Sequence, residues 1–190
     1  MFDDSYVIVD LETTGLSPKN GEIIEIGALK VVDNKIVDRM DVFVRPSRPL
    51  SYFTTNLTGI TNEMVAEGLD ITTALNVFND FSEGMRLMAH NAKFDMSFLD
   101  TYMNKHLGFG VPDNAMDTLL LARAIVKDVP NHKLGTLADR FGIDYSGAHR
   151  ALRDCEITYD VYNNIKKMKL KHLQIGCLIY LLLKSVLEAM

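Results

Sequence analysis

A short apolar run that carries two acidic residues constrains the fold of this chain most strongly. Residues 6–11 are rich in Val and Ile and predict a buried β-strand. Side chains alternate along a strand, so Asp10 and Glu12 point to the same face. Neighbouring carboxylates in apolar surroundings repel each other, and a hard divalent cation such as Mg²⁺ or Mn²⁺ is the simplest compensation. The alternative is a solvated strand end whose acids have no role.

Hydrophobic periodicity predicts further strands, of which the first two continue an antiparallel meander from the first run, and then helices. The further strands are expected at residues 22–32, 36–45, 85–89 and 115–117. The helices are expected at residues 71–81, 91–105, 118–126, 133–141 and 148–167. Asn91 is a suitable N-cap for the second of these helices. The pattern predicts an α/β domain over residues 1–168, with helices packed on a mixed sheet.

Composition narrows the functional classes. The chain has 190 residues, of which 47% are hydrophobic and 24% charged, as in an ordinary single-domain globular protein. Its net charge of −5 argues against a non-specific nucleic-acid coat protein. An enzyme that meets phosphate through metal ions is not excluded, because such a site is acidic without its metal. Cys155 and Cys177 match no metal-ligand spacing, and nothing near Met1 reads as a targeting segment, so we expect a cytoplasmic protein.

A third acid, Asp95, lies in the first turns of the helix expected at 91–105. At helical spacing it shares a stripe with Leu99 and Tyr102, so it is expected to face the core and to need a partner. The alternative is an acid at the start of a helix, where the positive end of the helix dipole favours a negative charge.

A histidine and a fourth acid form the last segment of interest. Asp154 lies near the edge of the apolar stripe of the helix expected at 148–167. If His149 were helical too, it would lie about 140° around the axis from Asp154. Both reach one cleft only if His149 lies on the loop or first turn that enters the helix, which Ser146 and Gly147 favour. A histidine there suits a general base, and the alternative is a surface or capping histidine.

Together these segments resemble the DnaQ-like exonucleases of the DEDD-h type. The match consists of Asp10-x-Glu12, then Asp95, then His149 followed five residues later by Asp154, and it covers about residues 5–167. The segment from Leu57 through Thr58, Gly59 and Ile60 to Thr61 is similar to the part of that family that packs against the terminal nucleotide. It looks most like the DNA-proofreading branch, which includes the epsilon subunit of bacterial DNA polymerase III and the exonuclease region of PolC-type polymerases.

The resemblance implies an RNase H-like fold, a central five-stranded mixed β-sheet flanked by α-helices. It implies a 3′–5′ exonuclease that uses two divalent cations, Mg²⁺ or Mn²⁺, to release nucleoside monophosphates. Asp10, Glu12 and Asp154 would hold one cation, Asp10 would bridge to the second, and Asp95 would act on it largely through water. His149 would be the base. The Thr13 backbone and the segment Leu57 to Ile60 would position the 3′ nucleotide.

Three alternatives remain open at this point. The substrate is expected to be a single-stranded or frayed 3′ end of DNA, but RNA ends or short oligoribonucleotides suit the same residues. A non-catalytic module that binds a polymerase would use the same fold without the chemistry. A plain α/β domain with scattered acids would bind no Mg²⁺ or Mn²⁺.

The last residues, 169–190, are expected to form a basic and then apolar helical tail. The apolar part, densest at 175–183, is too short for a membrane span. It is expected to cover an apolar patch, to bind a polymerase subunit or to mediate self-association. The run Lys166, Lys167, Lys169 and Lys171 reads as a solvated face, with contact to nucleic acid or a membrane surface as the alternative.

Overall fold

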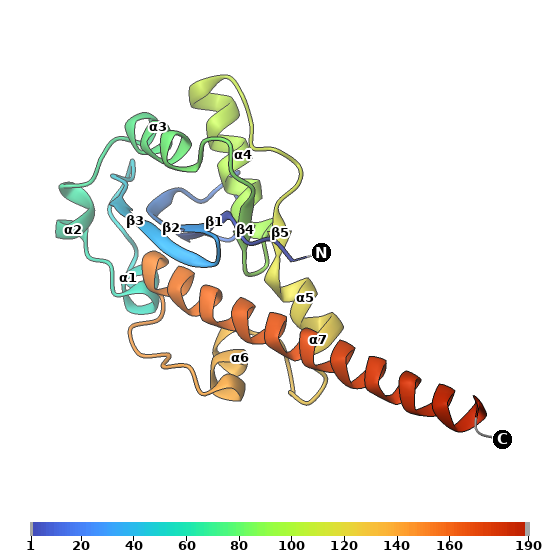
Figure 1. The fold of residues 1–190 in the computed structure, drawn as a ribbon. Coiled ribbons are helices and arrows are strands. Elements are labelled where there is room, and N and C mark those ends of the chain that lie inside the picture. Colours follow the sequence, from blue (N-terminus) through green and yellow to red (C-terminus); the bar gives the residue numbers. More distant parts are fainter. Residues whose placement is uncertain (1, 189–190) are drawn as a thin grey trace.

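A five-stranded mixed sheet forms the centre of the molecule (Figure 1). The computed structural model describes residues 2–188, with side chains described for residues 2–171 and 174. The strand order is β3-β2-β1-β4-β5, in which β1, β2 and β3 are antiparallel neighbours and β4 and β5 join parallel to β1. The strands are β1 (Tyr6–Thr13), β2 (Ile23–Val32), β3 (Lys35–Phe43), β4 (Leu87–Ala89) and β5 (Met116–Asp117). The predicted mixed sheet of five strands is confirmed.

The apolar residues of β1 suit its place as the middle strand. The residues from Tyr6 to Val9 are all fully buried, because helices cover both faces of the sheet and β2 and β4 flank the strand. The hairpin from β2 to β3 turns at Asp33 and Asn34, whose φ angles are 51° and 61°. Two consecutive left-handed residues are the geometry of a tight hairpin, and Asp and Asn adopt it most readily after Gly.

Helices cover the two faces of the sheet. Helices α3 (Ile71–Ser82) and α4 (Lys93–Leu107) pack on one face around Phe78 and Phe98. Helix α7 (Ala151–Glu188) crosses the other face, where Cys155 and Tyr162 meet side chains of β1 and β2. Helices α5 (Thr118–Ile125) and α6 (Leu134–Phe141) form a further apolar cluster against α7.

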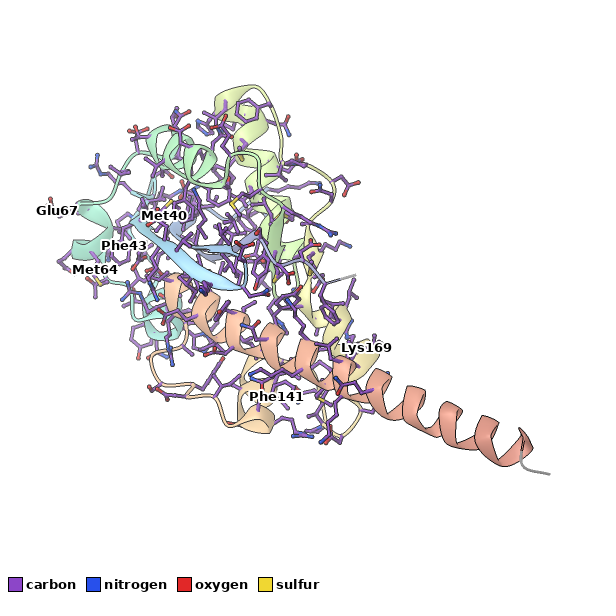
Figure 2. The ribbon with its side chains drawn as sticks, viewed as in Figure 1. Met40, Phe43, Met64, Glu67, Phe141 and Lys169 are labelled. Atoms are coloured by element: carbon purple, nitrogen blue, oxygen red, sulfur yellow. The ribbon has the colours of Figure 1, made fainter. Side chains whose placement is uncertain are left out.

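Two short helices, α1 (Tyr52–Thr58) and α2 (Asn62–Ala66), lie on the side of the sheet where β3 forms the edge (Figure 1). The sequence pattern turns helical from Thr61, which agrees with α2, whereas it does not predict α1, because α1 has seven residues and few apolar positions that repeat. Ile60 and Val65 anchor this segment against Ile24. Phe43 and Met64 pack against the same small core and are labelled at that end of the molecule in Figure 2.

Helix α7 is longer than the sequence pattern indicates. It begins at Ala151 and continues to Glu188, so the expected tail extends the helix predicted at 148–167 without a break. Figure 1 shows its C-terminal part projecting beyond the rest of the molecule, and Figure 2 marks Lys169 where it leaves the body. The apolar side chains of the tail lie outside the described residues. Within the part of the chain that the structure describes, no helix is long and apolar enough to cross a bilayer.

Candidate active site

The carboxyl end of β1 presents the first two acids. Asp10 lies opposite Gly27 and Glu12 lies opposite Glu25 in the antiparallel register with β2. Since residues two apart share a face, both carboxylates point to the side of the sheet that α7 covers. The register shifts between Glu12 and Thr13, so regular pairing ends directly after the acids.

Helix α4 brings Asp95 to the same strand end. The Asp95 side chain is 2% exposed, as the stripe with Leu99 predicts. Its Oδ1 accepts a hydrogen bond of 3.2 Å from the Leu11 N–H, which ties the first turn of α4 to β1. The expected N-cap role of Asn91 is wrong. Asn91 has a φ of 69° and donates its N–H to Asp117, and α4 begins at Lys93 without a side-chain cap.

The turn into α7 brings His149 and Asp154 together. His149 lies two residues before the helix with a φ of 66°, so it is outside the helix, as convergence on one cleft requires. Its N–H donates to Asp154 Oδ2 at 3.3 Å. Ligand atoms of Glu12, His149 and Asp154 all lie within 4.8 Å of one another. The His149 side chain is exposed, so it can reach a bound substrate.

Burial and mutual repulsion raise the pKa of each of the four carboxyls. Burial raises the pKa of Glu12 to about 8, and the nearby Asp154 and Glu25 carboxylates add to the effect. Burial also raises the pKa of Asp95 to about 8, although hydrogen bonds from backbone N–H groups oppose it. The pKa of Asp10 lies well above its ordinary value because of burial and of the charges on Asp95 and Asp154. Burial raises the pKa of Asp154, and the hydrogen bond from His149 opposes this.

These side chains fit a divalent cation. Asp154 Oδ1 is buried and has no hydrogen-bond partner among the described residues. Carboxylate oxygens are the ligands that Mg²⁺ and Mn²⁺ prefer. A cation would remove both the repulsion and the unsatisfied oxygen.

A fifth acid, Glu25, was not predicted. It is fully buried on β2, and its Oε1 accepts hydrogen bonds of 2.9 and 2.7 Å from the Arg150 guanidinium. Its Oε2 accepts the Ala151 N–H at 2.9 Å, so Glu25 fastens the start of α7 to the sheet. A signal existed in the sequence: Glu25 is an acid inside the run from Ile23 to Ala28, which is otherwise apolar or Gly.

The expected nucleotide-positioning segment divides into buried and exposed members. Thr58 and Ile60 are buried, and the Ile60 N–H donates to the Thr58 hydroxyl, so these two side chains support the turn. Leu57 is half exposed, and Gly59 ends α1 in the left-handed conformation. Thr13 donates its hydroxyl to the Gly15 carbonyl at 2.7 Å, which shapes the loop after β1. Leu57 and Gly59 are therefore the members of this segment that are open to solvent.

Comparison with known proteins assigns this arrangement to a family. Residues 7–162 match the family model described as "Exonuclease". The chain belongs to this exonuclease family. Nucleases of the family depend on divalent cations, in agreement with the carboxylate cluster.

Curated relatives of this exonuclease domain are much longer proteins. It is 44% identical over 160 residues to DNA polymerase III PolC-type from Caldanaerobacter subterraneus and 39% identical over 168 residues to that of Bacillus subtilis. These alignments cover 84% and 88% of the chain but only 11% and 12% of the relatives. The chain thus spans about one ninth of the length of the relatives it matches.

Solved structures agree on the fold. The exonuclease domain is similar to exonuclease X in complex with 5′-overhanging duplex DNA, with 30% identity, a TM-score of 0.69, and coverage of 85% of this chain and 91% of that one. It also resembles the zinc-bound complex of Escherichia coli exonuclease I with single-stranded DNA, with a TM-score of 0.77, 16% identity, and coverage of 92% and 43%. The predicted RNase H-like architecture is confirmed.

Proposed function

We propose that this chain is a divalent-metal-dependent 3′–5′ exonuclease that releases nucleoside monophosphates from the 3′ end of DNA. The observation that carries the proposal is the meeting of four acids from β1, α4 and α7 beside an exposed histidine at one strand end. The names of the relatives support DNA as the substrate, since they are DNA polymerases and a DNA-bound exonuclease. A duplex with a 5′ overhang has a recessed 3′ end, which agrees with the proposed polarity.

The family resemblance supplies the proposed roles, and the proximity of Glu12, His149 and Asp154 supports them. Asp10, Glu12 and Asp154 would hold one cation, and Asp95 together with Asp10 would serve a second. When bound, Mg²⁺ or Mn²⁺ supplies positive charge that offsets the phosphodiester and makes water more acidic. His149 takes a proton from the attacking water. The bond from phosphorus to the 3′ oxygen of the preceding nucleotide breaks, which leaves a nucleoside 5′-monophosphate and a new 3′ hydroxyl.

The test compares an oligonucleotide labelled at its 3′ end with one labelled at its 5′ end, with Mg²⁺ and with EDTA. The parent protein should release labelled mononucleotide first from the 3′ label, and only with the cation. Asp10→Asn, Asp95→Asn and Asp154→Asn should each abolish release while circular dichroism stays unchanged. Asp100→Asn is the matched control, because Asp100 is exposed on α4 and lies away from the cluster. Full activity in any of the three variants would refute the proposal.

Matched single-stranded DNA and RNA of one sequence test the choice of substrate. Faster hydrolysis of the DNA is expected, and faster hydrolysis of the RNA would overturn this part of the proposal. Titration with Mg²⁺ and with Mn²⁺ in the same assay tests the choice of cation.

The setting and partners are also proposed. The polymerase relatives support a cytoplasmic protein that acts beside a DNA polymerase, and the apolar sequence of residues 173–187 supports docking or self-association through the tail. Truncation after Leu170 should change the oligomeric state measured by light scattering or abolish polymerase binding. A truncated chain that keeps the oligomeric state, polymerase binding and activity of the full chain would remove this role.

A further inference from the structure

Helix α1 turns its apolar side to solvent. Tyr52, Phe53 and Leu57 are 86%, 74% and 49% exposed. Thr54 and Thr58, on the opposite side of the helix, are buried. A surface helix normally does the reverse, with its apolar stripe on the core and its polar side in water.

Hydrogen bonds explain why the threonines can face inward. The Thr58 hydroxyl donates to the Thr54 carbonyl at 3.0 Å and accepts the Ile60 N–H at 3.1 Å. The Thr54 hydroxyl pairs with the Ser51 hydroxyl at 2.9 Å. The buried polar atoms are thus satisfied, and the fold of α1 requires no aromatic residue at positions 52 and 53. The exposure of these two aromatic side chains therefore indicates that they bind a ligand.

A cationic groove borders the start of the same helix, at Ser51 and Thr54. It has a volume of about 630 Å³ and lies between the loop from β1 to β2, the start of α1 and the second half of α4. Lys19, Arg48 and Lys105 line it, and Glu22 is the single acid among its described lining residues. None of the three cations forms an ion pair with any residue whose side chain the structure describes. Three free cations beside one acid form a positive surface on a chain of net charge −5.

The groove borders the loop that follows the acids of β1. Thr14 lines it and lies two residues after Glu12. The Thr14 N–H donates to the Glu22 carbonyl at 2.9 Å, and Tyr102 on α4 donates its hydroxyl to the Gly21 carbonyl at 2.8 Å. The first bond closes the base of the loop from β1 to β2, and the second holds this loop against the helix that also supplies Asp95. A strand whose 3′ end lies at the carboxylates can therefore continue into the groove.

We propose that α1 and the cationic groove bind the single strand on the 5′ side of the nucleotide that is removed, with bases stacked on Tyr52 and Phe53 and phosphates beside Lys19, Arg48 and Lys105. Aromatic platforms next to a positive groove are how proteins bind single strands without reading sequence. This inference rests on the proposed function, because the catalytic cluster sets which end of the strand lies where. It adds a surface that holds several nucleotides, beyond the contact with the terminal one.

Area favours nucleic acid over a second copy of the chain, and the positive groove complements a strand of phosphates. Three large side chains bury about 150–250 Å² each at most, which falls short of the roughly 800 Å² per partner of a stable interface.

The experiment measures KM for oligothymidylates of two to eight nucleotides and, beside them, hydrolysis of the p-nitrophenyl ester of thymidine 5′-monophosphate. KM of the parent protein should fall with length and then level off. The double variant Tyr52→Ala/Phe53→Ala should raise KM for the long oligonucleotides at least about tenfold, as the loss of one or two stacked bases requires. Hydrolysis of the small ester should not change. Phe109→Ala is the matched control, because Phe109 is an exposed aromatic outside this surface.

Salt dependence tests the cations separately. The slope of log binding constant against log salt should shrink by about 0.7 for each cation removed, as for a single strand that loses one phosphate contact. Lys105→Ala is the variant, and binding of a fluorescent octathymidylate in EDTA is the measurement. Lys35→Ala is the control, since Lys35 is exposed beside the hairpin turn at the opposite end of the sheet.

Each outcome decides the proposal. An unchanged length dependence in the aromatic double variant would overturn it, and so would an unchanged salt slope in Lys105→Ala. A variant that alters only the mass in sedimentation would assign α1 to self-association instead. If the parent protein does not hydrolyse the small ester with Mg²⁺, the proposed function fails. The binding measurement in EDTA still tests the surface in that case.

Discussion

His149 adopts a left-handed backbone conformation that is unfavourable for a residue with a side chain, so the surrounding structure must hold it there. Two contacts do so. Asp154 accepts the His149 N–H, and the next residue, Arg150, is held by Glu25. This turn directs an exposed imidazole toward Glu12 and Asp154 without making it part of the helix. The position suits a group that must reach a substrate and release it.

His149→Ala should lower kcat by about 10²–10⁴-fold and change KM little, because a general base acts on the attacking water and contributes little to binding. Steady-state kinetics on an oligonucleotide with saturating Mg²⁺ measure both constants. His132→Ala is the control, since His132 hydrogen-bonds to the Val126 carbonyl and has no proposed role. A rise in KM at constant kcat would assign His149 to binding instead.

Glu25→Gln should destabilise the protein by roughly 3 kcal/mol, because it leaves the Arg150 guanidinium without its buried counter-charge. It should also lower kcat more than it raises KM, since the turn that carries His149 loses its anchor. Thermal unfolding and kinetics measure the two effects, and the amide shift of His149 in NMR reports the turn directly. Asp41→Asn is the matched control. Asp41 is a more exposed acid 3.7 Å from Arg150, so its loss should cost under about 1 kcal/mol. If the Glu25→Gln variant kept the stability of the parent protein and the amide shift of His149 did not change, Glu25 would not anchor this turn.

At the scale of elements, the close packing of α7 on β2 positions Asp154 and the turn that carries His149. A Cβ atom at Gly27 would lie 2.2 Å from the Ala151 carbonyl carbon and from the Leu152 nitrogen. The Cys155 thiol also contacts the Gly27 carbonyl, at 3.3 Å. Only a glycine lets the helix lie this close to the strand, and this closeness brings Asp154 to Asp10 and Glu12.

Gly27→Ala should therefore push α7 off the sheet, with a loss of about 3 kcal/mol or more and a fall in activity by at least tenfold. Denaturant unfolding and the exonuclease assay are the measurements. Gly135→Ala is the control, because its new methyl group meets only the Tyr145 ring at 3.1 Å and an alanine favours helix α6. Equal stability of the two variants would contradict the close-packing argument.

The sequence predicts best those elements whose apolar residues repeat at a regular spacing. Strand β1 and helices α3, α5 and α6 lie within two residues of their expected bounds, because each buries a regular apolar stripe. The sequence does not predict helix α1, because its seven residues hold few apolar positions that repeat. The buried pair of Glu25 and Arg150 was missed because the two residues lie 125 positions apart. Local patterns predict the strand that carries Asp10 and the buried stripe that carries Asp95. That these residues meet in one site was implied only by the family resemblance.

At the scale of the whole molecule, the structure separates the charges. Five acids gather around one end of β1, and three cations without an ion pair among the described residues line the groove along the loop that follows β1. The net charge of −5 therefore gives no indication of how this surface meets a polyanion. Protons or cations can neutralise the negative cluster, so we expect metal binding and the stability of the fold to be coupled.

That coupling predicts how the stability of the metal-free protein depends on pH. The pKa values of Glu12 and Asp95 rise to about 8 in the folded state, whereas unfolded carboxyls titrate near pH 4. Between these limits the folded state binds more protons than the unfolded state, so stability falls as pH rises from about 5 to 8. Mg²⁺ competes with those protons, and it should stabilise the protein more at pH 8 than at pH 5.5.

Thermal unfolding across this range, in EDTA and in Mg²⁺, measures both effects. The melting temperature in EDTA should fall by several degrees toward pH 8. Mg²⁺ at a hundred times its Kd should restore about 5–10 °C there, since such binding contributes about 2.7 kcal/mol and each kcal/mol corresponds to about 2–4 °C in a domain of this size. Asp154→Asn removes one charge from the cluster, so it should flatten the pH dependence and weaken the response to Mg²⁺. The exposed control Asp100→Asn should behave as the parent protein does. If the metal-free protein instead gained stability toward pH 8, the carboxyls would be ionised without strain in the fold, and the cluster would have no need of a cation.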